Sequence, residues 1–177
     1  LHPKRKNPVT GYWTFFCNPK KWELDKFLKQ GLEYDIWQFN PWYLDDVKPG
    51  QLGVIRVGHD TRTKKQLAGS PRLERGIYAV VEILSEPEQR TKPPDVYWLD
   101  WQESEWDQPV VRIRYIHNLM DNPLLLSSIA EDEIISQDRF LVSGFQNVVM
   151  PLREDVFRYI LDLINKEDEF SAKVIIE

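Results

Sequence analysis

The amino-acid sequence predicts a single α+β domain, in which strands are interrupted by short helices and long connections. Three observations support this class. Several short segments have the aromatic or alternating composition of strands, and the clearest spans residues 76–87. An amphipathic helix is expected over residues 153–170. The chain has 177 residues, 42% of them hydrophobic, which suits one core and one domain. We expect this domain at 11–170, between a basic tail at 1–10 and a tail at 171–177.

The first half of the chain alternates strand and loop signals. Residues 11–19 are aromatic-rich, with a glycine before them and Asn-Pro after them, which predicts a strand. A helix is expected over 18–31, with Asn18 as N-cap, Pro19 at the first helical position and Gly31 at the end. The turn "KPG" leads into a second strand at 51–58. Residues 58–76 are polar and predict a loop.

The second half begins with the strongest strand pattern. Residues 76–87 carry apolar side chains at alternate positions and end in a proline. Residues 85–108 predict a long acidic connection that still packs tryptophans. Alternation at 109–119 predicts another strand, and Asn122-Pro123 begins a short helix. An extended piece is expected within 144–152. The final helix should bury Val156, Ile160, Leu163 and Ile164 on one side.

Charge and cysteine content limit the possible functions. The net charge of −5 argues against a protein that coats nucleic acid by charge alone, although the first 75 residues are net basic. No apolar run approaches the roughly 18 residues that a membrane helix needs. Cys17 is the only cysteine, so no internal disulfide can form, and we expect a reducing, cytoplasmic location without a membrane partner.

Catalytic motifs are absent from the sequence. It contains no HExxH, CxxC, GxSxG, P-loop or GxGxxG pattern. His59-Asp60 has the composition of half an acid–base pair, and Cys17 stands where a thiol pKa can fall. A loop position for His59 and a small buried or pocket position for Cys17 explain both residues more simply. We therefore expect no enzyme activity, no metal and no cofactor.

The segment "YDIWQFNPWY" (34–43) is unusual because five of its ten residues are aromatic. It has neither the Leu, Ile and Val content nor the regular period of a core element. It also precedes a polar turn and a strand. Its composition therefore raises the question of why so much aromatic area lies beside an asparagine and a proline, just ahead of a turn.

Four segments in order resemble the EVE family of the PUA-like superfamily, which is related to YTH, SRA and ASCH domains. They are "GYWTFFCNP", "WQFNPW", "KPGQLGVIRVG" and "GIYAVVEILSEP". The residues that match the family pattern are Tyr12, Trp13, Pro19, Trp37, Gly50, Gly76, Ile77 and Val81. Many members have Lys-Ser-Glu-Pro where this chain has Phe16-Cys17-Asn18-Pro19, and the turn aspartate is Gln51. The segment after Trp37 is closer to the bacterial branch that accompanies restriction systems.

The resemblance implies a PUA-like, partly open β-barrel flanked by short helices. It also implies a nucleic-acid-binding module that reads a modified base, with modified cytosine such as 5-methylcytosine in DNA favoured over RNA. The base would be flipped or single-stranded when it enters an aromatic cage. A nuclease or motor, if one acts with this chain, would reside on another domain or subunit.

Stacking energies indicate what such a pocket needs. Extruding a base costs a few kcal/mol, and stacking on an aromatic ring regains roughly 1–3 kcal/mol. A buried methyl adds only about 0.8 kcal/mol, so polar groups must read the base edge. We expect base contacts from Phe16, Cys17, Asn18, Trp37, Asn40 and Trp42. We expect phosphate contacts from Arg56, Arg62, Lys64 and Lys65.

Three alternatives stay open at the level of sequence. The same pocket could read a modified base in RNA. The chain could be a small ASCH-type enzyme that uses Cys17, Lys20 or His59. The acidic, tryptophan-rich stretch 95–107 could be a protein-binding surface.

Overall fold

The computed structural model describes residues 8–144 and 149–176 of the chain. The seven strands of this described part form one mixed sheet in the order β2-β5-β4-β3-β1-β7, and β6 pairs with β4. The strands are β1 (Tyr12–Cys17), β2 (Tyr34–Gln38), β3 (Leu52–Val57), β4 (Gly76–Ile83), β5 (Val110–Asn118), β6 (Leu124–Leu125) and β7 (Val149–Pro151). The β1–β3 pair is parallel and every other pair is antiparallel.

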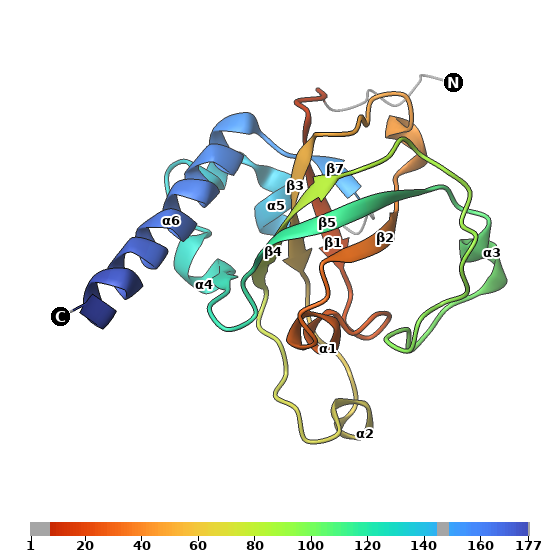
Figure 1. Ribbon diagram of the computed structural model, residues 1–177, viewed down its shortest axis with the longest axis horizontal. Helices are drawn as coiled ribbons and strands as arrows, with labels where there is room; N and C mark the ends of the chain where they lie inside the picture. The colour runs from red at the N-terminus through yellow and green to blue at the C-terminus, as the bar shows by residue number, and fades with distance from the viewer. Residues whose placement is uncertain (1–7, 145–148, 177) are drawn as a thin grey trace.

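The sheet curls into a half-barrel (Figure 1). The β3–β4 register shifts between Ile55 and Arg56, and the β4–β5 register shifts between Val80 and Val81. Such irregularities bend the bulged strand and increase its twist. Because β2 and β7 stand at the two ends of the strand order, the barrel stays open between them within the described residues. The predicted α+β class and partly open barrel are confirmed.

Helices are short except for the last one. They are α1 (Leu24–Lys29), α2 (Lys64–Leu67), α3 (Glu103–Trp106), α4 (Leu126–Ile129), α5 (Arg139–Ser143) and α6 (Glu154–Ile176), with 3₁₀ turns at Pro41–Tyr43 and Ile135–Gln137. Figure 1 shows α4, α5 and α6 on one side of the sheet, and the long connection with α3 on the other side, beside β2. No helix among the described residues is both long and apolar enough to cross a membrane.

The core divides into two clusters because successive side chains of a strand point to opposite faces of the sheet. On β3, Val54 packs toward α6 while Ile55 joins the other cluster. The cluster beneath α6 includes the helix residues Val156, Ile160 and Ile164, as the sequence pattern predicts, whereas Leu163 is only partly buried and packs against it. The opposite cluster holds most of the buried aromatic side chains together with Phe27 of α1.

Several sequence predictions need correction. Helix α1 begins at Leu24, because the Asn18 carbonyl instead accepts bonds from the backbone N–H groups of Lys21 and Trp22 in a tight turn. Residues 124–125 form a strand before the helical turn of α4. The loop at 58–76 contains α2, which has a capping box at Thr63. Helix α6 continues to Ile176 and so includes most of the expected tail at 171–177. Residues 1–7 of the expected basic tail lie outside the described residues.

The aromatic segment contains a strand that the sequence pattern does not predict. Residues Tyr34–Gln38 form β2, which pairs with β5 at the end of the sheet. Trp37 stands opposite Val111 in this pairing. The chain then turns through the 3₁₀ helix at Pro41–Tyr43. The segment therefore forms part of the wall of the barrel.

Candidate nucleic-acid interface

A pocket of about 1010 Å³ opens where β1 ends, between β2 and the connection that follows β4. Its walls come from segments far apart in sequence: the end of β1, the whole of β2, and residues 84–98. The register of β1 against β3 brings Arg56 beside Phe16, and Gly58 continues the wall. The pocket is thus built at the end of the barrel by β1, β2, β3 and the long connection.

Five aromatic side chains line this pocket. The rings of Trp22 and Trp37 lie 5.3 Å apart at an interplanar angle of 78°. Rings at this angle form a corner and cannot hold a flat base between two parallel faces. Trp37 is fixed by a second near-perpendicular contact with Phe15, at 5.9 Å. The aromatic lining consists of Phe16, Trp22, Tyr34, Trp37 and Trp98.

Cations outnumber carboxylates in the pocket wall, although the whole chain is acidic. Only Asp35 and Asp95 supply carboxylates to the lining. The Asp95 carboxylate accepts a hydrogen bond from Trp22 Nε1 at 3.1 Å and orients that ring. The lysine and arginine lining consists of Lys21, Arg56, Arg75, Arg90, Lys92 and Arg112. A wall of this composition favours a ligand with negative charge.

Asp35 is the most perturbed acid of the pocket. Burial raises its pKa to about 7, and nearby Asp95 adds to the rise. Hydrogen bonds donated by the Ile36 backbone N–H (2.8 Å) and the Tyr115 hydroxyl (3.3 Å) oppose it. A carboxyl group with this pKa can donate or accept a hydrogen bond near neutral pH. Among the described residues, no group of three or more His, Cys, Asp or Glu side chains is arranged to hold a metal ion.

Five of the predicted site residues line the pocket: Phe16, Cys17, Asn18, Trp37 and Arg56. The Cys17 thiol is 5% exposed and donates to the Trp22 carbonyl at 3.6 Å. Burial raises its pKa, and Asp25 adds to this effect. This agrees with the buried or pocket position that the sequence favours for Cys17, and it argues against the alternative of an activated thiol. The Arg56 guanidinium lies over the Phe16 ring and donates to the carbonyls of Leu141 (2.9 Å) and Val142 (3.1 Å).

The other two predicted base contacts lie outside the pocket lining. Asn40 is buried, and its side chain caps the 3₁₀ helix by accepting from the Trp42 backbone N–H at 3.0 Å. Its Nδ2 donates to the Val149 carbonyl at 3.0 Å. Trp42 is 44% exposed on the 3₁₀ helix and does not reach the pocket wall. Trp37 and Trp42, both expected to contact the base, therefore do not line one common pocket.

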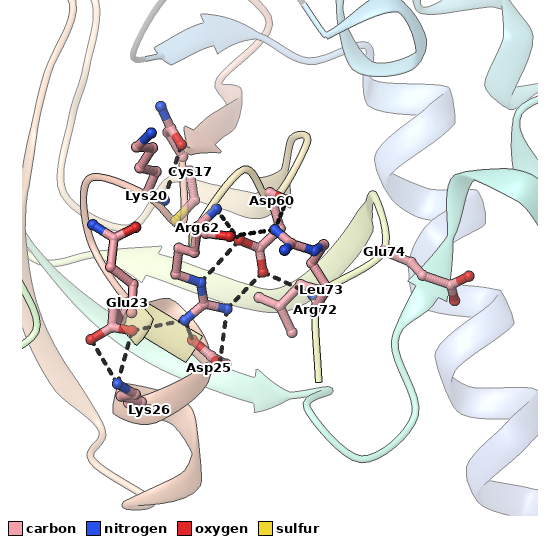
Figure 2. Close-up of polar contacts among 12 residues, drawn as sticks. Cys17, Lys20, Glu23, Asp25, Lys26, Asp60, Arg62, Arg72, Leu73 and Glu74 are labelled. Carbon is pink, nitrogen blue, oxygen red and sulfur yellow. Dashed lines mark hydrogen bonds and ion pairs between the residues drawn. The ribbon is translucent and has the colours of Figure 1, made fainter. Parts of the chain in front are cut away.

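Arg62 is fully buried in an ion cluster, which argues against its expected contact with phosphate (Figure 2). Its guanidinium donates to the carboxylates of Glu23 (2.8 Å), Asp25 (3.0 Å) and Asp60 (2.7 Å). Because its planar set of N–H donors is bound to these carboxylates inside the protein, the guanidinium does not face a phosphate. Lys64 and Lys65 lie on α2, exposed, and neither lines the pocket.

Sequence reasoning missed the residues that β2 and the long connection contribute. Asp35 lies in an aromatic segment whose hydrophobic residues follow no clear period, so no pattern indicated its position in the pocket. Arg90, Asp95 and Trp98 lie in a connection that has no periodic pattern. The tryptophans of that acidic connection were the one usable signal, since a purely solvent-exposed loop has little need of them.

The family model of the EVE domain matches residues 11–163. No curated protein matches the sequence. Solved structures with a similar fold include a protein from Leishmania major, at 16% identity and TM-score 0.59 over 93% of this chain and 99% of that one. A protein from Pseudomonas syringae has 16% identity and TM-score 0.55 over 86% and 98%.

A third similar structure is the human THYN1 protein in complex with DNA that contains 5-methylcytosine. It has 15% identity and TM-score 0.53 over 86% of this chain and 96% of that chain. Identities this low establish the likeness of fold alone, whereas the family model covers most of the sequence. The chain belongs to the EVE domain family.

Proposed function

We propose that this chain is a nucleic-acid-binding module that takes a flipped or single-stranded modified base into the pocket at the end of β1. Modified cytosine in DNA is the first candidate ligand. The observation that carries the proposal is the pocket itself, whose wall combines four kinds of group: aromatic rings, amide and carboxyl groups, and an excess of cations. The human protein of the same fold was crystallised with DNA containing 5-methylcytosine, which supports this choice.

The volume of the pocket suits this ligand class. About 1010 Å³ lies at the upper end of the usual range for small-molecule sites, about 300–1,000 Å³. A single base does not need so much space, and the remainder can receive the sugar and a flanking phosphate. Lys92 and Arg112 are exposed at the pocket, where they can meet phosphate oxygens.

Stacking on Trp37 is the central contact of the proposed complex. Trp37 and Trp22 meet near a right angle, so the base would lie on one ring and meet the edge of the other. A single stacking face returns roughly 1–3 kcal/mol per base, which about equals the cost of extrusion. Selectivity must then come from polar groups in the wall. We propose no catalytic role, and any nuclease or motor would belong to another domain or subunit.

The test is binding of the purified chain to short labelled DNAs and RNAs of one sequence at fixed moderate salt. The panel holds unmodified cytosine, 5-methylcytosine, 5-hydroxymethylcytosine and N6-methyladenine. We expect at least a tenfold preference, about 1.4 kcal/mol, for one modified DNA. The RNA arm decides between DNA and RNA. Binding that is equal for every member of the panel, or absent, would reject the proposal.

Two tryptophan variants test whether the base binds in this pocket. Trp37→Ala should weaken binding at least tenfold, whereas Trp42→Ala, a matched change outside the pocket lining, should alter affinity less than twofold. Trp37 also packs on Phe15 and Trp22, so Trp37→Phe serves as a milder variant with thermal unfolding as the folding control. If Trp37→Ala folds and binds with the same affinity as the parent, the base does not stack on Trp37.

A further inference from the structure

Arg90 is buried in the pocket wall with an unused hydrogen-bond donor. Its side chain is 7% exposed and lines the pocket, and its Nε has no hydrogen-bond partner among the described residues. The guanidinium carbon lies 5.8 Å from the centre of the Trp98 ring. Ring contact fixes the position of the guanidinium but does not satisfy its N–H groups.

A buried guanidinium of this kind needs an acceptor, because the group stays charged and has five N–H donors. Burial lowers the pKa of Arg90, and the negative charges of Asp35 and Asp95 oppose this effect. Arg90 Nε donates to neither carboxylate. Asp35 accepts from the Ile36 N–H and the Tyr115 hydroxyl, one bond at each oxygen, and Asp95 accepts from Trp22 and the Tyr97 N–H. Each Asp35 oxygen can accept one further bond. Native proteins seldom leave buried donors unpaired, so an unpaired one in a pocket points to a ligand acceptor.

We infer that Arg90 and Asp35 together read the edge of the bound base, Arg90 as donor and Asp35 as acceptor. The inference rests on the proposed function and names the edge that this pocket selects. Cytosine presents an amino group next to a ring nitrogen and a carbonyl oxygen. Its amino group can donate to the Asp35 carboxylate, while its two acceptors can receive the parallel N–H groups of Arg90.

The other bases fit this pair less well. Thymine places a carbonyl oxygen where cytosine has its amino group, and that oxygen would face the Asp35 carboxylate. Adenine has the amino group but only one acceptor beside it. The pair therefore ranks cytosine above adenine and adenine above thymine. This ranking does not depend on the C5 substituent, which the rest of the pocket must recognise.

The decisive comparison is between 5-methylcytosine and thymine, which share the C5 methyl and ring shape and differ in the edge. Each is placed opposite an abasic site in one duplex, so that neither has a partner to lose. At pH 8 the Asp35 carboxyl is mostly ionised, since its pKa, raised by burial, is about 7. We expect the parent chain to prefer 5-methylcytosine at least tenfold.

Two arginine variants then separate edge reading from charge. Arg90→Gln should reduce the preference to less than threefold. Arg112→Gln removes the same charge from an exposed position on the pocket wall and should weaken both duplexes while leaving the preference unchanged. Asp35→Asn supplies an amide that can also donate, and it should improve thymine binding relative to 5-methylcytosine.

The outcomes distinguish this inference from the proposed function. If Arg90→Gln is folded and keeps the tenfold preference, the inference is wrong, even where Trp37→Ala has lost binding and the proposed function stands. If the parent binds neither duplex, or binds both equally, the inference is wrong, whereas the proposed function fails only if the whole panel of modified DNAs and RNAs is bound equally or not at all. Thermal unfolding checks each variant. Arg90→Lys, which keeps the charge but loses the planar fork, and Asp35→Asn decide the question if Arg90→Gln does not fold.

Discussion

Arg62 and Asp60 form a bidentate ion pair in which both side chains are buried. Arg62 Nε donates to one carboxylate oxygen at 2.9 Å, and Nη2 donates to the other at 2.7 Å. Burial acts to raise the pKa of Asp60, but the hydrogen bonds from Arg62 and from the Leu73 backbone N–H hold it below the ordinary value. The pair joins the loop after β3 to α1, because Arg62 also bonds to Glu23 and Asp25 (Figure 2).

Replacing Arg62 should cost much of the stability of this fold. Arg62→Met leaves buried carboxylates without their cation, and breaking such a pair typically costs about 3–5 kcal/mol. Urea unfolding at pH 7 measures the loss. Arg158→Met is the matched control, because Arg158 pairs with Glu154 on the exposed side of α6 and should cost less than about 1 kcal/mol. Similar losses for the two variants would contradict a structural role for the cluster.

Arg62 also illustrates how far the sequence could predict the site. Local patterns located β1, β3, β4, β5 and α6, because their period is set by neighbours in the chain. The segment "TRTKK" (61–65) contains three of the residues that the sequence predicts as phosphate contacts. No local pattern indicates that Arg62 is buried against three carboxylates while Lys64 and Lys65 stay exposed. Such a choice depends on contacts across 37 and 39 positions of sequence.

The pocket shows the same limit. Phe16, Asn18 and Trp37 could be predicted as lining residues from the resemblance and from the aromatic composition of their segments. Arg90 could not, because it lies in a connection without periodicity and reaches the wall only through tertiary folding. Asn40 was misassigned for a local reason: an asparagine before a proline is also the pattern of a helix cap, and that is its role here.

The stability of the fold should depend on pH through Asp35. Its folded pKa is raised from 3.8 to about 7 by burial, while Asp95 and Arg90 act on it with opposite signs and Tyr115 donates to it. Between these two values Asp35 binds more protons in the folded state than in the unfolded state, so its contribution to stability falls as pH rises through this window and is smallest above pH 7.

Asp35→Asn should remove this dependence. The amide keeps an acceptor for the Ile36 N–H and has no charge to bury. One pKa unit corresponds to about 1.4 kcal/mol, and partial exposure reduces the effect, so we expect about 1–2 kcal/mol of added stability above pH 8. At pH 4, where the Asp35 carboxyl is protonated in the folded chain, the difference in stability between the variant and the parent should be much smaller than at pH 8.5. Urea unfolding at pH 4, 6 and 8.5 measures this, and a difference that is constant across the series would contradict it.

The phosphate contacts should lie on the pocket wall and not on α2. Lys92→Ala and Arg112→Ala should each weaken binding to every member of the panel and lower the slope of log affinity against log salt by about 1. Lys64→Ala and Lys65→Ala are matched removals of charge outside the pocket lining and should leave the slope within error. Titrations at four salt concentrations give the slopes. If only Lys64→Ala and Lys65→Ala lowered the affinity and the slope, the phosphate contacts would lie on α2, as the sequence predicts.

The Cys17 thiol should react slowly in the folded chain. It is 5% exposed and bonded to the Trp22 carbonyl, and burial together with the charge of Asp25 raises its pKa, so its thiolate fraction at pH 8 is smaller than that of an exposed thiol. An aromatic disulfide reagent should modify the native chain at least a hundredfold more slowly than the urea-unfolded chain. The readout is unambiguous because the sequence contains one cysteine. Rapid modification of the native chain would instead indicate an activated thiol, and it would bring back the enzyme alternative that uses Cys17 as a nucleophile.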